Sequence, residues 1–266
     1  MSHLLREHAP ITEAGWELLD SEARERLTPA LGARKLVDFA GPHGWEHSAT
    51  NLGRTEQITG VPEGVAARRR LVLGLVELRV RFSIARSELE DADRGAQDVD
   101  LDELDRAARR IAGAENAAVF HGWSAAGIKG IIEASTHDRI TLGEDCELYP
   151  RHAAKAVDAL RSAGIEAPYG LALGPEAHTH VLETSEHGGY PLLEHLREIV
   201  GGPIVWTPAV RGGAVLSMRG GDFLFDSGED LSIGYETHDA DAVHLYLEES
   251  FSFRVATPDA AVALNP

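Results

Sequence analysis

Three residues with metal-binding side chains lie close together in this sequence. His178 and His180 have the spacing that places two ligands on one face of a strand, and Glu183 follows them. A zinc ion held there would make the protein a metal-dependent hydrolase or protease, which we keep as the alternative function. However, the segment reads as a helix or loop, and the order of its residues matches no metal motif. We therefore expect surface histidines here and no metal site.

No segment has the pattern of a catalytic nucleophile. Ser124 lies in Gly-Trp-Ser-Ala-Ala, which lacks the second glycine of a hydrolase elbow. The Arg-Gly-Gly-Asp stretch at 219–222 lacks the Gly-Lys-Ser of a phosphate loop and is more typical of a β-turn. Cys146 follows two acidic residues, which disfavour a thiolate. The sequence therefore predicts a protein that is not an enzyme.

The composition excludes several classes of partner. The chain has 25 Lys and Arg residues against 43 Asp and Glu, a formal net charge of −18, whereas a nucleic-acid-binding surface must be basic. No apolar run is long enough to cross a membrane, and residues 1–10 lack the apolar core of a signal peptide. The single cysteine excludes an intrachain disulfide. We expect a cytoplasmic protein with no nucleic-acid and no membrane partner.

The elements that would carry these residues alternate between helices and strands. Apolar residues at three- and four-residue steps predict helices over four segments: 12–31, 100–120, 150–163 and 191–200. Thr12 is the expected N-cap of the first, and Asp100 with Glu103 has the form of a capping box at the second. Short strands are predicted between the later helices and over most of the chain after Phe223. This pattern is typical of an α+β fold.

Residues 46–84 differ from the rest because they have β-type patterns with no helix nearby. Two strands, 48–58 and 69–84, flank a break at 60–64 that contains two glycines and a proline. In the second strand the even-numbered residues are the more apolar set, as in a half-buried strand. Two long strands without a covering helix predict a projecting hairpin or arm.

Several short motifs follow one another along nearly the whole chain. Among them are Ala-Pro-Ile at 9–11, Gly-Pro-x-Gly-Trp at 41–45, Gly-Tyr-Pro at 189–191, Arg-Gly-Gly-Asp-Phe at 219–223 and Asp-Leu-Ser-Ile-Gly-Tyr at 230–235. In this order they closely resemble the motifs of the encapsulin nanocompartment shell proteins, the linocin-like family 1 encapsulins. Any one motif would be weak, but the collinear set is specific.

The resemblance implies an α+β, tailed-bacteriophage major-capsid-like fold with a peripheral domain, an extension arm and an axial domain. The expected parts are the N-terminal part of the peripheral domain (1–47), the arm (48–81), the peripheral domain with its spine helix (82–136), the axial domain (137–215) and a C-terminal β segment that completes both domains (216–266). Copies of such a chain, about sixty in the smallest shells, close into an icosahedral particle. Family shells enclose cargo enzymes, ferritin-like iron oxidases or dye-decolourising peroxidases, through a C-terminal targeting peptide.

The family architecture also implies where the targeting peptide would bind. An extended peptide needs apolar pockets and a few polar contacts, which the N-terminal helix, the segment after it and the C-terminal sheet could provide. The residues expected to form this cargo groove are Leu27, Leu31, Arg34, Asp38, Leu231 and Ile233.

Two further expectations concern a pore and a cofactor. Glu183, Glu186 and His187 precede Gly188-Gly189, in the loop that would line a five-fold pore, where rings of acidic side chains favour cations. Some family members bind a flavin against a Trp whose position is Ser87 here, so we expect no flavin and no other cofactor. A true phage capsid protein, which would have a cleaved scaffold segment, is the third interpretation.

Overall fold

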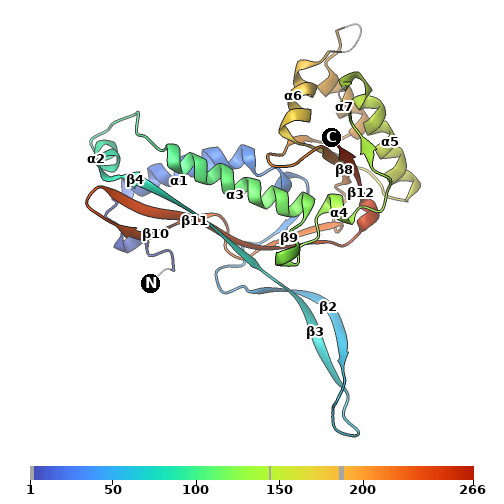
Figure 1. Cartoon of the computed structure of the whole chain (residues 1–266), viewed down its shortest axis with the longest axis horizontal. Coiled ribbons are helices and arrows are strands. Elements are labelled where there is room, and N and C mark those ends of the chain that lie inside the picture. The colour runs from blue at the N-terminus through green and yellow to red at the C-terminus, as the bar shows by residue number, and fades with distance from the viewer. Residues whose placement is uncertain (1–2, 144, 186–188) are drawn as a thin grey trace.

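The computed structural model describes residues 3–143, 145–185 and 189–266. Figure 1 shows two lobes and a projecting hairpin. In one lobe, two long helices lie on a sheet. In the other, three helices surround a second sheet. The N-terminus lies beside the first lobe and the C-terminus in the second.

The two helices of the first lobe are α1 (Glu13–Ala30) and α3 (Asp102–His121). The Thr12 hydroxyl accepts a hydrogen bond from the Gly15 amide at 3.0 Å, which confirms Thr12 as the N-cap of α1. The capping box expected at α3 was wrong. Asp100 accepts from the Asp102 amide, but the Glu103 carboxylate binds the Ser83 amide of a neighbouring strand instead of turning back to its own helix.

The sheet under these helices has five strands in the order β1-β9-β11-β10, and β4 also pairs with β11. The strands are β1 (Asp38–Ala40), β4 (Val76–Ala85), β9 (Phe223–Ser227), β10 (Ser232–His238) and β11 (Ala242–Val255). Strand β11 connects the sheet because it pairs with β4, β9 and β10 along its length. Strand β10 lies at the end of the order, so one of its edges has no strand neighbour.

The second lobe contains the other five-stranded sheet, with the order β5-β12-β8-β6-β7. Its strands are β5 (Ile140–Thr141), β6 (Tyr169–Leu173), β7 (Ile204–Trp206), β8 (Gly213–Ser217) and β12 (Ala261–Asn265). The helices of this lobe are α5 (Tyr149–Ser162), α6 (Pro175–Glu183) and α7 (Leu192–Val200). Every residue of β6 and β8 is buried. The predicted helices at 150–163 and 191–200 are confirmed, and the segment around His178, which was read as a helix or loop, is helix α6.

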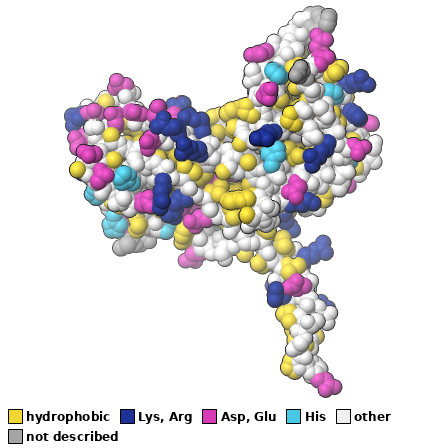
Figure 2. All heavy atoms as spheres, viewed as in Figure 1, with side chains coloured by type: hydrophobic (Ala, Val, Ile, Leu, Met, Phe, Trp, Pro, Cys, Tyr) yellow, Lys and Arg dark blue, Asp and Glu magenta, His cyan; other side chains and the backbone are white. Residues whose placement is uncertain are grey.

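The projecting hairpin consists of β2 (Ala49–Ile58) and β3 (Ala67–Gly74), which pair only with each other (Figure 1). The single strand predicted over 69–84 is divided at Leu75. Before this residue the chain belongs to the hairpin as β3, and after it the chain enters the first sheet as β4. Figure 2 shows hydrophobic side chains along the hairpin, where Ile58, Val65 and Val72 are exposed.

Two shorter helices complete the fold, α2 (Arg86–Asp93) and α4 (Ile131–Ala134). The buried apolar residues of the described chain form two clusters. One lies between α1, α3 and the strands β4, β10 and β11, and the other fills the second lobe and extends to β9. Among the described residues, no helix is both long and apolar enough to span a bilayer.

Candidate functional site

A groove of about 390 Å³ lies between the C-terminal half of α1 and the start of β10. Five of the six residues predicted to form a peptide groove line it: Leu27, Leu31, Arg34, Leu231 and Ile233. The other lining residues include Arg6, Asp20, Arg24, Thr28 and Asp230. The structure therefore brings together side chains from three segments that are far apart in the sequence.

The apolar residues of the groove have two different roles. Leu27 and Ile233 are 6% and 2% exposed and belong to the core between α1, α3 and the sheet, so they form the floor. Leu31 and Leu231 are half-buried and pack against that core from the rim. Apolar side chains of a ligand would therefore gain most contact area at Leu31 and Leu231. Beside the groove, β10 has an edge without a strand neighbour, where an extended backbone could pair before Tyr235, whose amide already donates to the Leu4 carbonyl at 2.8 Å.

Arg34 closes one end of the groove and binds three carboxylates. Its guanidinium donates from Nε to Glu115 (2.6 Å), from Nη1 to Asp230 (2.6 Å) and from Nη2 to Glu249 (2.8 Å). Glu115 comes from α3, Asp230 precedes β10 and Glu249 lies on β11. Arg34 thus joins a helix, a turn and a strand, and its position is fixed by all three.

The Arg34 cluster holds more carboxylates than one guanidinium can neutralise. Glu115 and Glu249 are 0% and 1% exposed, and burial raises the pKa of both. Repulsion from Glu115 raises the pKa of Glu249 further, well above its ordinary value. Burial alone would lower the pKa of Arg34, but the surrounding carboxylates raise it on balance. We infer that Glu115 and Glu249 share one proton, since two adjacent buried carboxylates cannot both ionise.

The other end of the groove is polar and more exposed. Arg6 donates to the Asp20 carboxylate at 2.8 Å, and its guanidinium carbon lies 4.0 Å from the centre of the Trp16 ring. The groove therefore has an apolar floor between two arginines, one half-buried and paired with Asp20 and one held by buried carboxylates. Such a site suits a short extended segment that carries apolar side chains and at least one acceptor group.

Asp38 is not among the residues that line this groove, and its role in binding a peptide stays a prediction. A short 3-10 turn (Ala33–Lys35) follows α1, and the chain then enters β1, where the Asp38 carboxylate accepts a hydrogen bond from the Gly221 amide at 2.7 Å. The chain direction changes between Arg34 and Asp38, so the two side chains serve different parts of the sheet.

The residues predicted to line a pore are only partly described. Glu183 is exposed at the C-terminal end of α6. Glu186 and His187 lie outside the described residues, so their arrangement with Glu183 stays a prediction.

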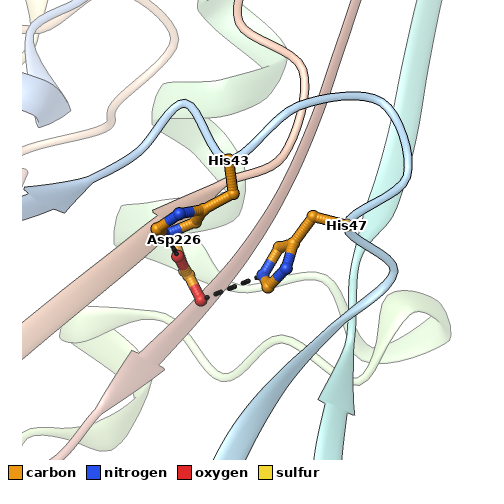
Figure 3. Close-up of side chains that lie close together, drawn as sticks. All are labelled: His43, His47 and Asp226. Carbon is orange, nitrogen blue, oxygen red and sulfur yellow. Dashed lines mark ion pairs between the residues drawn. The ribbon is translucent and has the colours of Figure 1, made fainter.

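The metal ligands considered first do not converge. His178, His180 and Glu183 lie on helix α6, where residues two positions apart point about 200° from each other. In the described ranges, the one group of three side chains that could hold a metal ion is His43, His47 and Asp226, whose ligand atoms all lie within 4.8 Å of one another (Figure 3). The sequence contains one signal for this group, the four-residue spacing of the two histidines, which our prediction did not use.

Comparison with known proteins gives consistent findings. A family model described as "Encapsulating protein for peroxidase" matches residues 1–252. The chain is 47% identical over 271 residues to the type 1 encapsulin shell protein of Rhodospirillum rubrum, covering 100% of this chain and 97% of that protein. It is 41% identical over 265 residues to the type 1 encapsulin shell protein of Mycobacterium tuberculosis, covering 100% of both chains.

The structure is also similar to a solved capsid-like particle. The subunit of a virus-like particle from Pyrococcus furiosus aligns with a TM-score of 0.65 at 18% identity, covering 94% of this chain and 99% of that one. At this identity the likeness shows the fold alone, which is the capsid-like fold that the sequence motifs implied.

Proposed function

Because this chain belongs to the encapsulin family of shell proteins, we propose that the groove between α1 and β10 binds the targeting peptide of a cargo enzyme. The chain itself is a shell subunit with the capsid-like fold, as the predicted fold class and role stated. The cargo that we propose is a peroxidase of the dye-decolourising kind or a ferritin-like iron oxidase. The family description, which names a peroxidase, favours the first.

The observation that carries this proposal is the convergence of Leu31, Leu231 and Arg34 on one groove. Leu31 and Leu231 offer apolar surface that the subunit leaves partly uncovered, and β10 has an edge without a strand neighbour. An extended peptide can place alternate apolar side chains against the two leucines while its backbone runs beside β10. Modest affinity at each groove is sufficient, because an oligomeric cargo presents several peptides to one shell.

The test replaces a rim leucine and measures loading separately from assembly. Shells are produced together with a monomeric reporter that carries the C-terminal extension of a dye-decolourising peroxidase, so that avidity cannot mask a weak groove. Leu31→Asp and Leu231→Asp each place a charge against the apolar part of the peptide. We expect loading to fall at least about 10-fold, equivalent to about 1.4 kcal/mol, in shells of normal size.

The matched control is Leu182→Asp, the same change at a leucine that is 58% exposed on α6. It should load reporter as the unchanged shell does. Full loading of both groove variants, in particles of normal size by chromatography, would place the binding site elsewhere.

The remaining features of the shell are proposed from the family. About sixty copies close into the particle, and the hairpin β2–β3 reaches a neighbouring subunit, whose surface covers Ile58, Val65 and Val72. We keep the domain boundaries expected from the sequence, 1–47, 48–81, 82–136, 137–215 and 216–266, but place the end of the projecting part of the arm at Leu75, where the chain enters the first sheet as β4. The shell resides in the cytoplasm and does not bind nucleic acid, since its net charge is −18.

Two proposals concern small molecules. Ser87 is exposed at the start of α2 and offers no ring on which a flavin could stack, so we propose that the subunit carries none. Glu183 is exposed at the end of α6, and we propose that it contributes to an acidic pore that admits cations to the cargo.

A further inference from the structure

Two histidines and one aspartate meet where the projecting hairpin joins the body of the subunit. His43 and His47 lie on the loop between β1 and β2, and Asp226 lies on β9. Figure 3 shows both imidazoles beside the Asp226 carboxylate. The His43 Nε2 atom is 2.7 Å from Asp226 Oδ1, and His47 Nε2 is 3.5 Å from Asp226 Oδ2.

The loop that carries the histidines is held in place by its backbone. The amide of His43 donates to the Ser227 carbonyl at 3.0 Å, and the amide of Gly44 donates to the Gly228 carbonyl at 2.8 Å. Gly41 begins the loop with a φ of 111°, and a side chain there would lie 2.4 Å from the Ser227 carbonyl oxygen. The two imidazoles are therefore fixed next to β9 before any ligand arrives.

Two buried polar atoms in this cluster lack a hydrogen bond. They are His47 Nε2 and Asp226 Oδ1, whose contacts with their neighbours do not have hydrogen-bond geometry. By contrast, Asp226 Oδ2 accepts a hydrogen bond from the Thr50 hydroxyl, which also lies 2.7 Å from the Ser252 hydroxyl. The carboxylate is thus held by hydroxyl groups on one side, whereas on the other side its close contacts are with the two imidazoles.

We propose that His43, His47 and Asp226 bind a divalent first-row transition-metal ion of the Zn²⁺ type. Two imidazoles and one carboxylate are a common ligand set for such an ion, with water in the remaining position. With metal–ligand bonds of about 2.0–2.2 Å, neighbouring ligands of a tetrahedral ion are about 3.4 Å apart. The imidazoles lie 2.7 and 3.5 Å from the two different oxygens of Asp226, and one ligand atom from each residue lies within 4.8 Å of the other two, so the side chains would have to adjust to reach this spacing around an ion.

The surroundings of the cluster suit a metal site. The His43 side chain is 44% exposed, and it lines a groove of about 350 Å³ together with Asp226 and Phe225, which gives an ion access from solvent. Thr50 and Ser252 would orient the ligating carboxylate, as outer hydrogen bonds do in metal sites.

A bound ion would join the arm to the body of the subunit. Thr50 is the second residue of β2, His47 lies just before that strand, and Asp226 belongs to the central sheet. The ion would therefore restrict movement of the hairpin at its base. This inference does not depend on the peptide groove, which lies on other elements.

The test uses assembled, chelator-treated particles of the full chain and titrates them with Zn²⁺ by calorimetry, and with Co²⁺ by visible absorption. We expect one ion per chain and the intense absorption of tetrahedral Co²⁺. Asp226→Asn and the double variant His43→Gln/His47→Gln should lose this site. Thr50→Val, which removes only the outer hydrogen bond, should weaken Zn²⁺ binding about 10- to 100-fold.

The control is His238→Gln, which removes an exposed histidine on β10, remote from the arm, and should leave the stoichiometry unchanged. Hydrogen exchange gives a second measurement, because Zn²⁺ should slow exchange at the start of β2 in the unchanged protein and have no such effect in the double variant. Zn²⁺ binding that is equal in the unchanged protein and the double variant would overturn the proposal, and the cluster would then be a set of His–Asp contacts only.

Discussion

The two five-stranded sheets of this subunit differ in what they bury. In the second lobe, β6, β8 and β12 bury mainly small and aliphatic residues together with Tyr169, and no carboxylate of the described part of those strands is buried. In the first lobe, β11 buries Glu248, Glu249, Ser250 and Ser252. The groove, the cluster of Arg34 with its carboxylates, and the cluster of two histidines with Asp226 all include residues on or next to this first-lobe sheet.

The difference separates a sheet that buries mainly apolar side chains from one that also buries charged side chains. Buried carboxylates cost free energy unless cations and hydrogen bonds compensate them, and here Arg34 binds Glu249 and Arg79 binds Glu248. The sheet of the first lobe therefore contains buried polar groups whose partners come from distant parts of the sequence. The described strands of the second-lobe sheet bury no carboxylate, so they contribute apolar packing without a desolvation cost of this kind. The predictions below test this separation.

The largest effect is expected from Arg34→Met, which leaves Glu115 and Glu249 buried without their cation. Removing one partner of a buried ion pair typically costs about 3–5 kcal/mol of stability. We expect a free energy of unfolding lower by about that amount, measured by denaturant titration. Arg106→Met, at a half-exposed arginine on α3, is the control and should stay within about 0.5 kcal/mol. An equal loss in both variants would mean that the cluster does not stabilise the first sheet.

Leu216→Ala tests the apolar sheet. Leu216 is fully buried on β8, and shortening a buried leucine typically costs about 2–5 kcal/mol, according to the cavity that remains. The same measurement on Leu182→Ala, at an exposed leucine, should show a change within about 0.5 kcal/mol. In contrast to the Arg34 variant, the loss in Leu216→Ala should be independent of pH, since no titratable group is removed.

The Arg34 cluster should make stability depend on pH with a defined sign. Because burial raises the pKa of Glu115 and Glu249 in the folded protein, the folded state retains a proton that the unfolded chain loses at lower pH. This contribution is complete below the unfolded pKa, about 4.3, and is lost as pH rises through the raised folded value.

We expect the Tm of the unchanged protein to fall by several degrees from mildly acidic to alkaline pH. Glu249→Gln, which cannot ionise, should fall less over the same range. Glu183→Gln removes an exposed carboxylate and is the matched control, with the pH profile of the unchanged protein. A Glu249→Gln profile parallel to that of the unchanged protein would show that the shared proton is absent.

The smallest effect on subunit stability is expected from Val72→Asp on the hairpin. Val72 is 56% exposed, so the change should alter the free energy of unfolding by no more than about 0.5 kcal/mol. The assembled fraction, measured by light scattering, should nevertheless fall, because a charge would have to be buried against a neighbour. Val72→Thr keeps the shape without the charge and should assemble normally. Normal assembly of Val72→Asp would mean that a neighbour does not cover this face.

Local sequence patterns were sufficient to predict most helices and strands, but not which elements lie side by side. The apolar periodicity of α1 and α3 and the Thr12 cap are signals within one element, so these helices could be predicted. The alternation across 69–84 continues unbroken through Leu75, because it records which side of a strand is apolar and not which strand lies beside it. For α6 the choice between helix and loop stayed open, because its nine residues bury only Ala177 and Val181, too few for a clear period.

The prediction of the candidate sites was limited in the same way, because local patterns do not show which elements lie side by side. Five of the six residues expected to form a peptide groove line one cavity, whereas the turn after α1 takes Asp38 to β1, away from that cavity. Asp226 is separated from His43 by most of the sequence, and no spacing rule connects residues whose strand and loop meet only in the folded protein. Such a cluster is visible only once the sheet order is known.

The direct passage from β3 into β4 has a mechanical consequence. Leu75 alone separates the two strands, so a pull on the hairpin is transmitted along the chain into β4. Strand β4 is in register with β11 over ten residue pairs, and the hydrogen bonds of an antiparallel pair run perpendicular to the strands. A force along β4 therefore loads these bonds together, in shear, instead of opening them one by one. A particle swollen by internal pressure would distribute tension from each arm into the longest strand pairing of its subunit.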